Sequence, residues 1–341
     1  MKGLIVPQVG SLKMAYDIPE PVMGPYDALV QVLACGICNG TDLKVIDGHF
    51  KGFDTYPCVL GHEACGRVIA VGKKVKNYKT GDIVLRAKLR DTERYYSGWG
   101  AFAERALVTD YHAMVADGCR DVPVKHMAEQ ILPPEIDPAK GQMIITLKEV
   151  YSALLRFGVS AEKTVMINGC GPVGQAMTVF CKLLGVSRLM VSDMDEVRLE
   201  RARELGADLL VNPAQEDVQQ KVKQHFPEGV DIFIDAVGRN ELINLGLKVI
   251  GFNGKVAVYG ISPVTCAEID WEYAPYNWSI QFVQKPTFPE ESAVHAQVVE
   301  YVRRGAINLD DFVTHVMSVD DFEEGFSLVK QRKAGKIALT F

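Results

Sequence analysis

The stretch from Val165 to Gly174 constrains the fold of this chain more than any other. It reads as an apolar run followed by Gly169-x-Gly171-x-x-Gly174 and then by apolar residues at helical spacing. In such a loop the first glycine permits a tight turn, the second lets backbone approach a pyrophosphate, and the third lets the helix pack on the strand. The helix N-terminus then offers free N–H groups to the phosphates. The sequence therefore predicts a dinucleotide-binding unit.

Asp193 strengthens this prediction. It follows the next predicted strand, Arg188 to Ser192, and stands about 20 residues after Gly174, which is the usual spacing for the residue that binds the adenosine ribose. A carboxylate there accepts hydrogen bonds from the ribose diol and repels a 2′-phosphate, which favours NAD over NADP. Asp193 could also cap the helix predicted over Glu196 to Glu204, and the two roles can coexist. We therefore expect NAD to be the cofactor.

Composition and charge exclude several other classes of protein. The chain has 341 residues, enough for about two domains, and 48% of them are hydrophobic. A net charge of −6 without a long basic run gives no basis for nucleic-acid binding. The apolar run after Met1 is too short for a signal peptide, and no stretch reaches membrane-span length. Because eight scattered cysteines are typical of intracellular thiols, we expect a cytoplasmic protein that does not bind membranes.

Two kinds of pattern divide the chain. Up to about residue 145, short strand-like runs alternate with proline and glycine, which is typical of a compact β-rich domain. From Val165 onward, strand and helix patterns alternate, which predicts a parallel sheet of the α/β class. Its later strands, Asp231 to Asp235 and Lys255 to Tyr259, end at the edge where such sheets bind ligands. Further predicted elements are helices near Glu291 to Arg304 and Asp320 to Lys330, and a last strand from Lys336.

Cys38, His62 and Glu63 are the main candidates for chemistry outside the α/β region. A thiolate, an imidazole and a carboxylate are ligand types of catalytic zinc, which keeps a fourth position open for water or substrate. Cys38 follows one predicted strand and His62 precedes another, so both could lie at one rim of a sheet. Taken alone, His62 is more often a structural histidine, and Cys38 a small buried side chain. Cys35 and Cys38 could form a redox pair, although the βαβ context of that motif is missing.

Several motifs together identify a family. Gly36-Ile-Cys38, Gly61-His62-Glu63, Gly81-Asp82-Ile-Val and the glycine loop occur in this order, followed by Phe312-Val-Thr-His315. The combination resembles the zinc-dependent alcohol and polyol dehydrogenases of the medium-chain dehydrogenase/reductase superfamily, over nearly the whole chain. The resemblance implies an α/β fold in which a Rossmann domain, a doubly wound parallel sheet, is inserted in a GroES-like β-rich catalytic domain. The implied boundaries are 1–145 and 285–341 for the catalytic domain and 146–284 for the Rossmann domain.

The resemblance also implies a set of metal ligands. Cys38 and His62 match zinc ligands, and Glu63 matches a carboxylate that sits beside the metal and sometimes ligates it. The position expected for a third ligand falls on Ile145, which cannot bind a metal. Glu149 lies one helical turn further on the same face, so Glu149 or Glu63 is expected to complete the zinc sphere. Glu149 is equally well explained as a helix-start carboxylate or a surface charge.

A second, structural zinc site is not expected. In the family it needs a lobe with four cysteines, and the corresponding segment, Arg86 to Glu104, contains none. We therefore predict one catalytic zinc per chain. Aromatic residues replace the lobe and could line a substrate pocket or belong to the core: Tyr95, Tyr96, Trp99 and Phe102.

Proton transfer is implied to involve a short segment after Cys38. Thr41 matches the hydroxyl that receives the substrate proton, although it stands one residue later than usual. Lys44 occupies the position of the usual relay histidine, and an ammonium group can accept a proton only if burial lowers its pKa. His49 or solvent could take that role instead.

The implied cofactor site follows the glycine loop and the strand ends. Arg198 matches a basic residue near the adenosine ribose, and the residues after the two later strands match backbone beside the nicotinamide. The positions that match cofactor-binding residues are Gly169, Gly171, Pro172, Val173, Gly174, Asp193, Arg198, Val237, Gly238, Tyr259, Gly260 and Ile261.

The sequence thus predicts a zinc-dependent oxidoreductase that transfers a hydride between a secondary alcohol, polyol or sugar-like substrate and NAD. A zinc-free NAD(P)-dependent quinone or alkene reductase of the same superfamily is the first alternative, because the third ligand is missing. A non-catalytic NAD-binding protein is the second. Since Rossmann sheet edges pair in this family, we also expect a homodimer or homotetramer.

Overall fold

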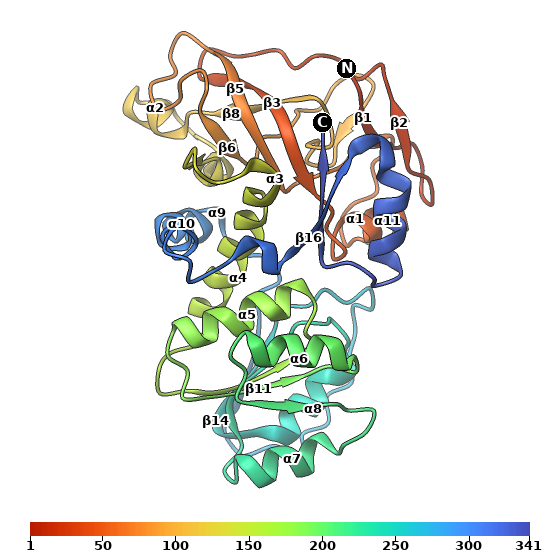
Figure 1. Cartoon of the computed structure of the whole chain (residues 1–341), viewed down its shortest axis with the longest axis vertical. Coiled ribbons are helices and arrows are strands. Elements are labelled where there is room, and N and C mark those ends of the chain that lie inside the picture. Colours follow the sequence, from red (N-terminus) through yellow and green to blue (C-terminus); the bar gives the residue numbers. More distant parts are fainter. The chain divides into compact units, whose positions relative to one another are not determined.

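The computed structural model describes residues 1–341 and divides into two compact units. The first unit contains residues 1–148 and 287–341, and the second contains residues 149–286 (Figure 1). The first unit is therefore discontinuous, because the chain leaves it through a helix and returns to it near the C-terminus. None of the helices combines the length and the apolar character that crossing a bilayer requires.

The first unit is built mainly from short strands. Its strands are β1 (Gly3–Val6), β2 (Lys13–Ala15), β3 (Asp27–Gly36), β4 (Cys58–Val59), β5 (Ala64–Val71), β6 (Ile83–Leu85), β7 (Tyr96–Ser97), β8 (Arg105–Thr109), β9 (Ile131–Leu132), β16 (Val313–Ser318) and β17 (Lys336–Thr340). Its helices are α1 (Asp42–Ile46), α2 (Tyr111–Ala116), α3 (Pro138–Gly141), the start of α4 (Met143–Phe157), α9 (Phe288–Ala293), α10 (His295–Arg303) and α11 (Phe322–Lys330). Three short 3₁₀-helices cover Val124–Ala128, Leu309–Asp311 and Val319–Asp321.

Two sheets organise this unit. The larger has the strand order β16-β17-β3-β5-β6-β9, with β8 also paired to β3, and the smaller has the order β2-β1-β4-β7. The C-terminal strand β17 pairs with β3 through Ala338 opposite Gly36, so the end of the chain completes a sheet that begins near its start. Phe102 and Leu339 are fully buried in the core, with Phe326 packed beside them.

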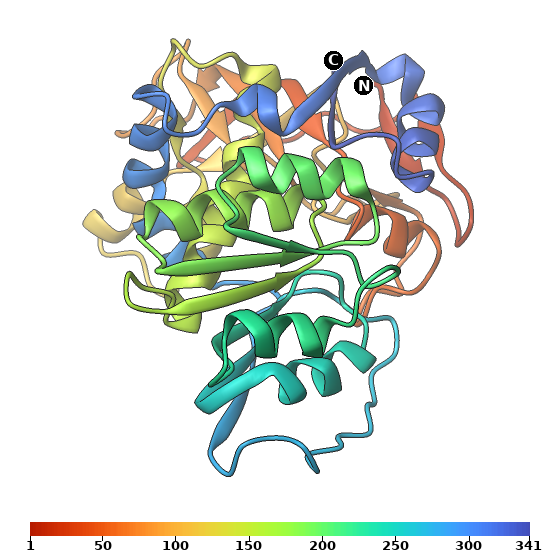
Figure 2. The same cartoon turned by 60° about the horizontal axis from the view of Figure 1, so that its bottom comes forward.

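The second unit contains one six-stranded sheet in the order β12-β11-β10-β13-β14-β15, and all its pairings are parallel. The strands are β10 (Thr164–Asn168), β11 (Arg188–Ser192), β12 (Leu209–Val211), β13 (Val230–Asp235), β14 (Ile250–Val258) and β15 (Trp278–Phe282). The helices are α5 (Pro172–Leu183), α6 (Glu196–Glu204), α7 (Val218–His225) and α8 (Glu241–Val249). Helices α5 and α6 cover one face of the sheet, and α7 and α8 cover the other (Figure 2).

The central strands of this sheet are apolar because both of their faces are covered. Val165, Met166 and Ile167 in β10 are fully buried, as are Phe233 and Ile234 in β13. A continuous buried run is typical of parallel strands between two helix layers. The predicted α/β class and its doubly wound sheet are therefore confirmed.

One predicted helix differs from the observed structure. The spacing predicted a single helix near Glu291 to Arg304, but the chain forms α9 and then α10, with a break at Val294. Helix α9 starts earlier than predicted, at Phe288, because Thr287 and Glu290 form a capping box. The break places Glu291 and His295 on consecutive helices that both face the interior of the first unit.

Glu291 lies in a buried ion network that ties distant parts of the first unit together. Its Oε1 lies 2.7 Å from Nε of Arg86 and 3.2 Å from Nζ of Lys148. Lys148 is fully buried and also donates to Oε1 of Gln130, 2.9 Å away. Burying three charges is tolerable only when each is paired in this way. The network therefore fixes α9 against α4 and against the end of β6.

Replacing His295 with glutamine is expected to remove part of the acid sensitivity of folding. His295 Nε2 lies 2.9 Å from the carbonyl of Ile131, and burial, reinforced by the charge of Lys148, lowers its pKa to about 4. The unfolded chain binds this proton near pH 6.5, so stability falls as the pH drops from about 6.5 to about 4, by about 3 kcal/mol. The free energy of unfolding, measured with denaturant across this pH range, should therefore change less with pH in His295→Gln than in the wild type. An equal slope in both proteins would contradict the assignment.

Candidate active site

The loop that carries Cys38 is fixed by a buried carboxylate. Cys38 follows β3, and its backbone N–H donates to Oδ2 of Asp42, 2.9 Å away, while the N–H of Asp42 donates to the carbonyl of Cys38. Asp42 is fully buried at the start of α1. These two bonds close the turn between β3 and α1, and they set the position of the Cys38 side chain.

His62 and Glu63 reach the same place from the neighbouring strand. They immediately precede β5, which pairs with β3 so that Ala64 stands opposite Cys35. Gly61 has φ of +96°, and a Cβ there would lie 2.6 Å from the backbone nitrogen of Phe102, so only glycine fits. The strand register therefore brings both residues to the rim where the Cys38 loop begins, as predicted.

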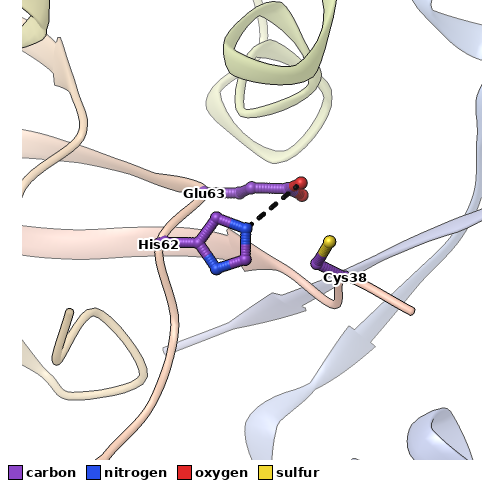
Figure 3. A group of neighbouring side chains, drawn as sticks. All are labelled: Cys38, His62 and Glu63. Atoms are coloured by element: carbon purple, nitrogen blue, oxygen red, sulfur yellow. Dashed lines mark ion pairs between the residues drawn. The ribbon is translucent and has the colours of Figure 1, made fainter. Parts of the chain in front are cut away.

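The side chains of Cys38, His62 and Glu63 point toward one another (Figure 3), and one potential ligand atom of each lies within 4.8 Å of the others. Nε2 of His62 lies 3.9 Å from Oε1 of Glu63. The other ring nitrogen, Nδ1, faces Oδ1 of Asp42 at 3.5 Å, and neither of these two atoms has a hydrogen-bond partner. A metal-ligating histidine typically has its second nitrogen oriented by a carboxylate. The donor set and its surroundings therefore fit a zinc ion.

Glu63 is held by partners that the sequence analysis did not identify. Nζ of Lys336 lies 2.8 and 2.6 Å from its two carboxylate oxygens, and the hydroxyl of Thr146 donates to Oε1 over 2.9 Å. Burial opposes both charges, but the Glu63 carboxylate raises the pKa of Lys336 to about 12, and Lys336 in turn lowers the pKa of Glu63. Glu63 is thus an ionised, buried carboxylate, as a metal ligand must be.

A buried amide lies on the other side of this carboxylate. A Cβ at Gly36 would meet Oε1 of Gln142 at 2.2 Å and Oε2 of Glu63 at 2.4 Å, so these two groups fill the space that a side chain would need. Gln142 is fully buried, and its two amide atoms have no hydrogen-bond partner. Glycine at position 36 is therefore a requirement of the site.

Helix α4 passes the site without supplying a ligand from Ile145. Ile145 is fully buried, and its neighbour Thr146 reaches Glu63 instead. Glu149 is partly buried further along the helix and does not belong to the cluster of potential metal ligands. The structure thus brings Cys38 and His62 together with Glu63 but not with Glu149.

The three candidates for proton transfer have different surroundings. Thr41 is buried at the start of α1, close in sequence to Cys38. Lys44 is half-buried in the same helix; burial lowers its pKa, and the charge of the Cys38 thiolate only partly opposes this. His49 lies beyond the helix with an exposed side chain, and its backbone N–H donates to the carbonyl of Lys44. The burial of Thr41 and Lys44 favours them over His49.

In the second unit, the glycine loop has the geometry of a phosphate cradle. Gly169 has φ of +100°, and a Cβ at Gly174 would lie 1.9 Å from the carbonyl oxygen of Gly169. A Cβ at Gly171 would meet no atom within 4 Å, so the loop leaves open space there. Pro172 begins α5, followed by Val173, and its ring removes a backbone N–H that would have no partner in the helix. These features fit a dinucleotide pyrophosphate.

Asp193 connects this loop to the end of β11. Its Oδ2 accepts from the backbone N–H of Cys170 over 2.7 Å, and its Oδ1 accepts from that of Asp195 over 3.0 Å. The cap of α6 is Asp195, whose carboxylate accepts from Val197 and Arg198, so Asp193 does not cap this helix. Arg198 lies in the first turn of α6, with Nε 3.8 Å from Asp195.

The strand ends beside the predicted nicotinamide site are organised by Asp235, which the sequence analysis did not single out. Its Oδ1 accepts from the N–H groups of Val237 and Gly238 over 2.8 and 2.9 Å. Its carbonyl accepts from Tyr259 and Gly260, and Ile261 follows directly in the chain. A Cβ at Gly260 would lie 2.0 Å from the backbone nitrogen of Gly238, so the two loops touch through glycine.

Comparison with known proteins agrees with this geometry. Residues 24–117 match a family model described as alcohol dehydrogenase GroES-like domain, and residues 172–282 match one described as zinc-binding dehydrogenase. Together these models span more than half of the chain.

Relatives match the chain over nearly its full length. An L-threonine 3-dehydrogenase from Pseudoalteromonas translucida (strain TAC 125) is 28% identical over 95% of both chains. Among solved structures, the alcohol dehydrogenase TADH from Thermus sp. ATN1 has a TM-score of 0.82 at 23% identity and covers 100% of both chains. The 2R,3R-butanediol dehydrogenase from Bacillus subtilis has a TM-score of 0.82 at 22% identity, over 100% of this chain and 99% of that one. The chain belongs to the zinc-type medium-chain alcohol dehydrogenase family of oxidoreductases, as its motifs predicted.

Proposed function

We propose that the protein is an NAD- and zinc-dependent dehydrogenase that oxidises the secondary hydroxyl of a small alcohol, polyol or sugar-like molecule. The convergence of half-buried Cys38 and His62 with buried Glu63 in one cluster carries this proposal, because this donor set suits catalytic zinc. Two relatives support the substrate class, since threonine and butane-2,3-diol both carry a secondary hydroxyl. Small-molecule substrates are also what the family's members take.

Each residue of the site has a part in this proposal. When bound, zinc supplies a Lewis acid for the hydroxyl oxygen, and NAD supplies the hydride acceptor. Cys38, His62 and Glu63 would hold the metal, with Lys336 keeping the Glu63 carboxylate in place. Thr41 would receive the hydroxyl proton. In the second unit, the glycine loop would bind the pyrophosphate, and Asp193 and Arg198 would lie at the adenosine ribose, while 237–238 and 259–261 would line the nicotinamide.

The zinc content is part of the proposal. No cysteine stands between Arg86 and Glu104, so a four-cysteine structural site cannot form there. We expect one zinc per chain, and metal analysis that finds two would contradict this.

Assembly is proposed from an exposed sheet edge. Strand β15 ends the sheet of the second unit, and its last residue, Phe282, is 57% exposed. An unpaired edge strand with exposed apolar side chains readily pairs with another copy. We propose a homodimer or homotetramer, which light scattering would distinguish from a monomer.

A substrate panel tests the function. Purified protein should reduce NAD with secondary alcohols and polyols, and a chelator should abolish the reaction. Activity on quinones or activated alkenes without zinc would support the alternative that the missing ligand at Ile145 suggests. Binding of NAD without turnover of any alcohol would indicate a non-catalytic protein. Either result would overturn the proposal.

Replacing Lys44 should change the pH profile of the reaction. A proton acceptor must be unprotonated, so kcat should rise with pH through the pKa of Lys44, which burial lowers. Lys44→Met should reduce kcat by roughly 10- to 100-fold. Lys44→His should move the rise in kcat toward about pH 6.5, the ordinary pKa of a histidine side chain. His49→Gln serves as the control. If His49→Gln alters the profile and Lys44→Met does not, the relay is His49.

A further inference from the structure

Three aromatic side chains form a wall beside the proposed metal ligand His62. The ring of Trp99 lies 5.4 Å from the imidazole of His62, centroid to centroid, at an interplanar angle of 52°. Phe53 stacks on Trp99 at 6.2 Å, and Phe50 meets it edge-on at 5.8 Å. All three side chains are half-buried, so part of the wall is accessible. We call Phe50, Phe53 and Trp99 the aromatic wall.

The backbone at Trp99 has a strained conformation, although the ring also packs against the core of the first unit, as Phe50 and Phe53 do. Its φ is +66°, a left-handed conformation that is rare for a bulky residue. The two residues that follow Trp99 hold it there, since the backbone N–H of Gly100 donates to the carbonyl of Val59 and that of Ala101 donates to the carbonyl of Gly61. Such strain clusters at functional sites, so it is a reason to ask what the ring contacts. Here it turns a large apolar ring toward the residue that precedes Glu63.

The other three aromatic candidates between Arg86 and Glu104 do not contact a proposed metal ligand. Phe102 is fully buried in the core of the first unit. Tyr95 is buried, and its hydroxyl donates to Oδ1 of Asp17 over 2.9 Å. Tyr96 is 39% exposed, and its ring contacts Phe53. Trp99 is therefore the one of the four whose ring lies against a proposed metal ligand.

We propose that Trp99 is a specificity-determining residue, and that the enzyme prefers small secondary alcohols with an apolar substituent, such as methyl, on the carbon that is oxidised. This deepens the proposed function and rests on it. If Cys38, His62 and Glu63 hold the metal, a hydroxyl bound to it would lie near His62, and a substituent on its carbon could then reach the wall. Phe50 and Phe53 offer no hydrogen bond, and Trp99 offers only its indole N–H. A hydroxylated substituent placed there would lose water partners without replacement.

Two substrates that differ by a single hydroxyl test this preference. Propane-1,2-diol carries a methyl group where glycerol carries CH₂OH, and both have a secondary hydroxyl. The zinc-loaded wild type should prefer propane-1,2-diol by roughly 10- to 100-fold in kcat/KM. Trp99→Ala should reduce this ratio by about tenfold. Trp99→Phe, which keeps an aromatic face, should retain most of it.

Controls separate specificity from effects on the metal or the fold. Trp271 is 64% exposed in the second unit, so Trp271→Ala should leave the ratio unchanged. Zinc affinity, measured by competition with a chelator, should be equal in the wild type and Trp99→Ala. Two results for Trp99→Ala would overturn the role of Trp99 but leave the proposed function standing. One is an unchanged ratio of kcat/KM for the two substrates. The other is a loss of zinc affinity together with an equal loss of kcat/KM for both substrates. A zinc-loaded wild type that oxidises no alcohol would overturn the proposed function itself, and this proposal with it.

Discussion

Replacing Glu63 with glutamine is expected to lower zinc affinity by at least roughly 100-fold and to abolish most NAD reduction. The amide removes the negative charge that would bind the metal, while it keeps the size of the side chain. It also leaves Lys336 buried without a counter-charge, and breaking a buried pair in this way costs about 3–5 kcal/mol of stability. The measurements are zinc competition with a chelator, steady-state kinetics and denaturant unfolding.

Two further variants separate the metal from the fold. Glu149→Ala tests the alternative third ligand, and we expect it to retain zinc and activity because Glu149 lies outside the ligand cluster. The double variant Glu63→Gln with Lys336→Met removes the unpaired charge, so it should recover stability but not zinc affinity. If Glu149→Ala loses zinc while Glu63→Gln keeps it, Glu149 is the ligand and the proposed sphere is wrong.

Replacing Asp193 with asparagine is expected to raise the KM for NAD by roughly 10- to 100-fold and to reduce the preference for NAD over NADP. The carboxylate would accept hydrogen bonds from the ribose diol, and its charge would repel a 2′-phosphate. Asparagine keeps one oxygen that can accept from the N–H of Cys170, so the loop should retain its shape. The measurements are kcat/KM for both cofactors and the binding of NADH and NADPH.

Asp208→Asn is a matched control for this variant. Asp208 accepts from the backbone N–H of Leu189, on the same strand β11 that Asp193 follows, but its partner lies near the other end of that strand. The cofactor ratio should therefore not change in Asp208→Asn. A wild type that prefers NADP, or an unchanged ratio in Asp193→Asn, would show that another residue selects the cofactor.

Local patterns were sufficient to predict the architecture of the second unit. The glycine loop and the apolar strands have short-range signatures, because the three glycines lie within six residues of one another and each buried strand is continuous in the sequence. The β11 strand and the α6 helix lie where the spacing placed them. The residue that caps the N-terminus of α6 was harder to predict, since Asp193 and Asp195 are two residues apart and both have a carboxylate that can cap a helix.

The site of the first unit was predictable only in part. Cys38, His62 and Glu63 were identifiable because their residue types suit zinc and short motifs surround them. Lys336 was not, because it is 273 residues away from Glu63 in the chain and only the pairing of β17 with β3 brings it near. The only sign in the sequence that Lys336 has a buried partner was its position at the start of a mainly apolar strand. The wall residue Trp99 was among four aromatic candidates, and its contact with His62 depends on a backbone conformation that the spacing does not reveal.

Titration of metal-free protein with zinc tests the central claim most directly. The metal would be removed with a chelator under conditions that keep the chain folded, and zinc would then be returned in steps while NAD reduction with a secondary alcohol is followed. The proposed site predicts that activity rises linearly and stops at one zinc per chain, and that Cys38→Ala shows no such rise. Full activity in the metal-free protein would contradict the proposed mechanism.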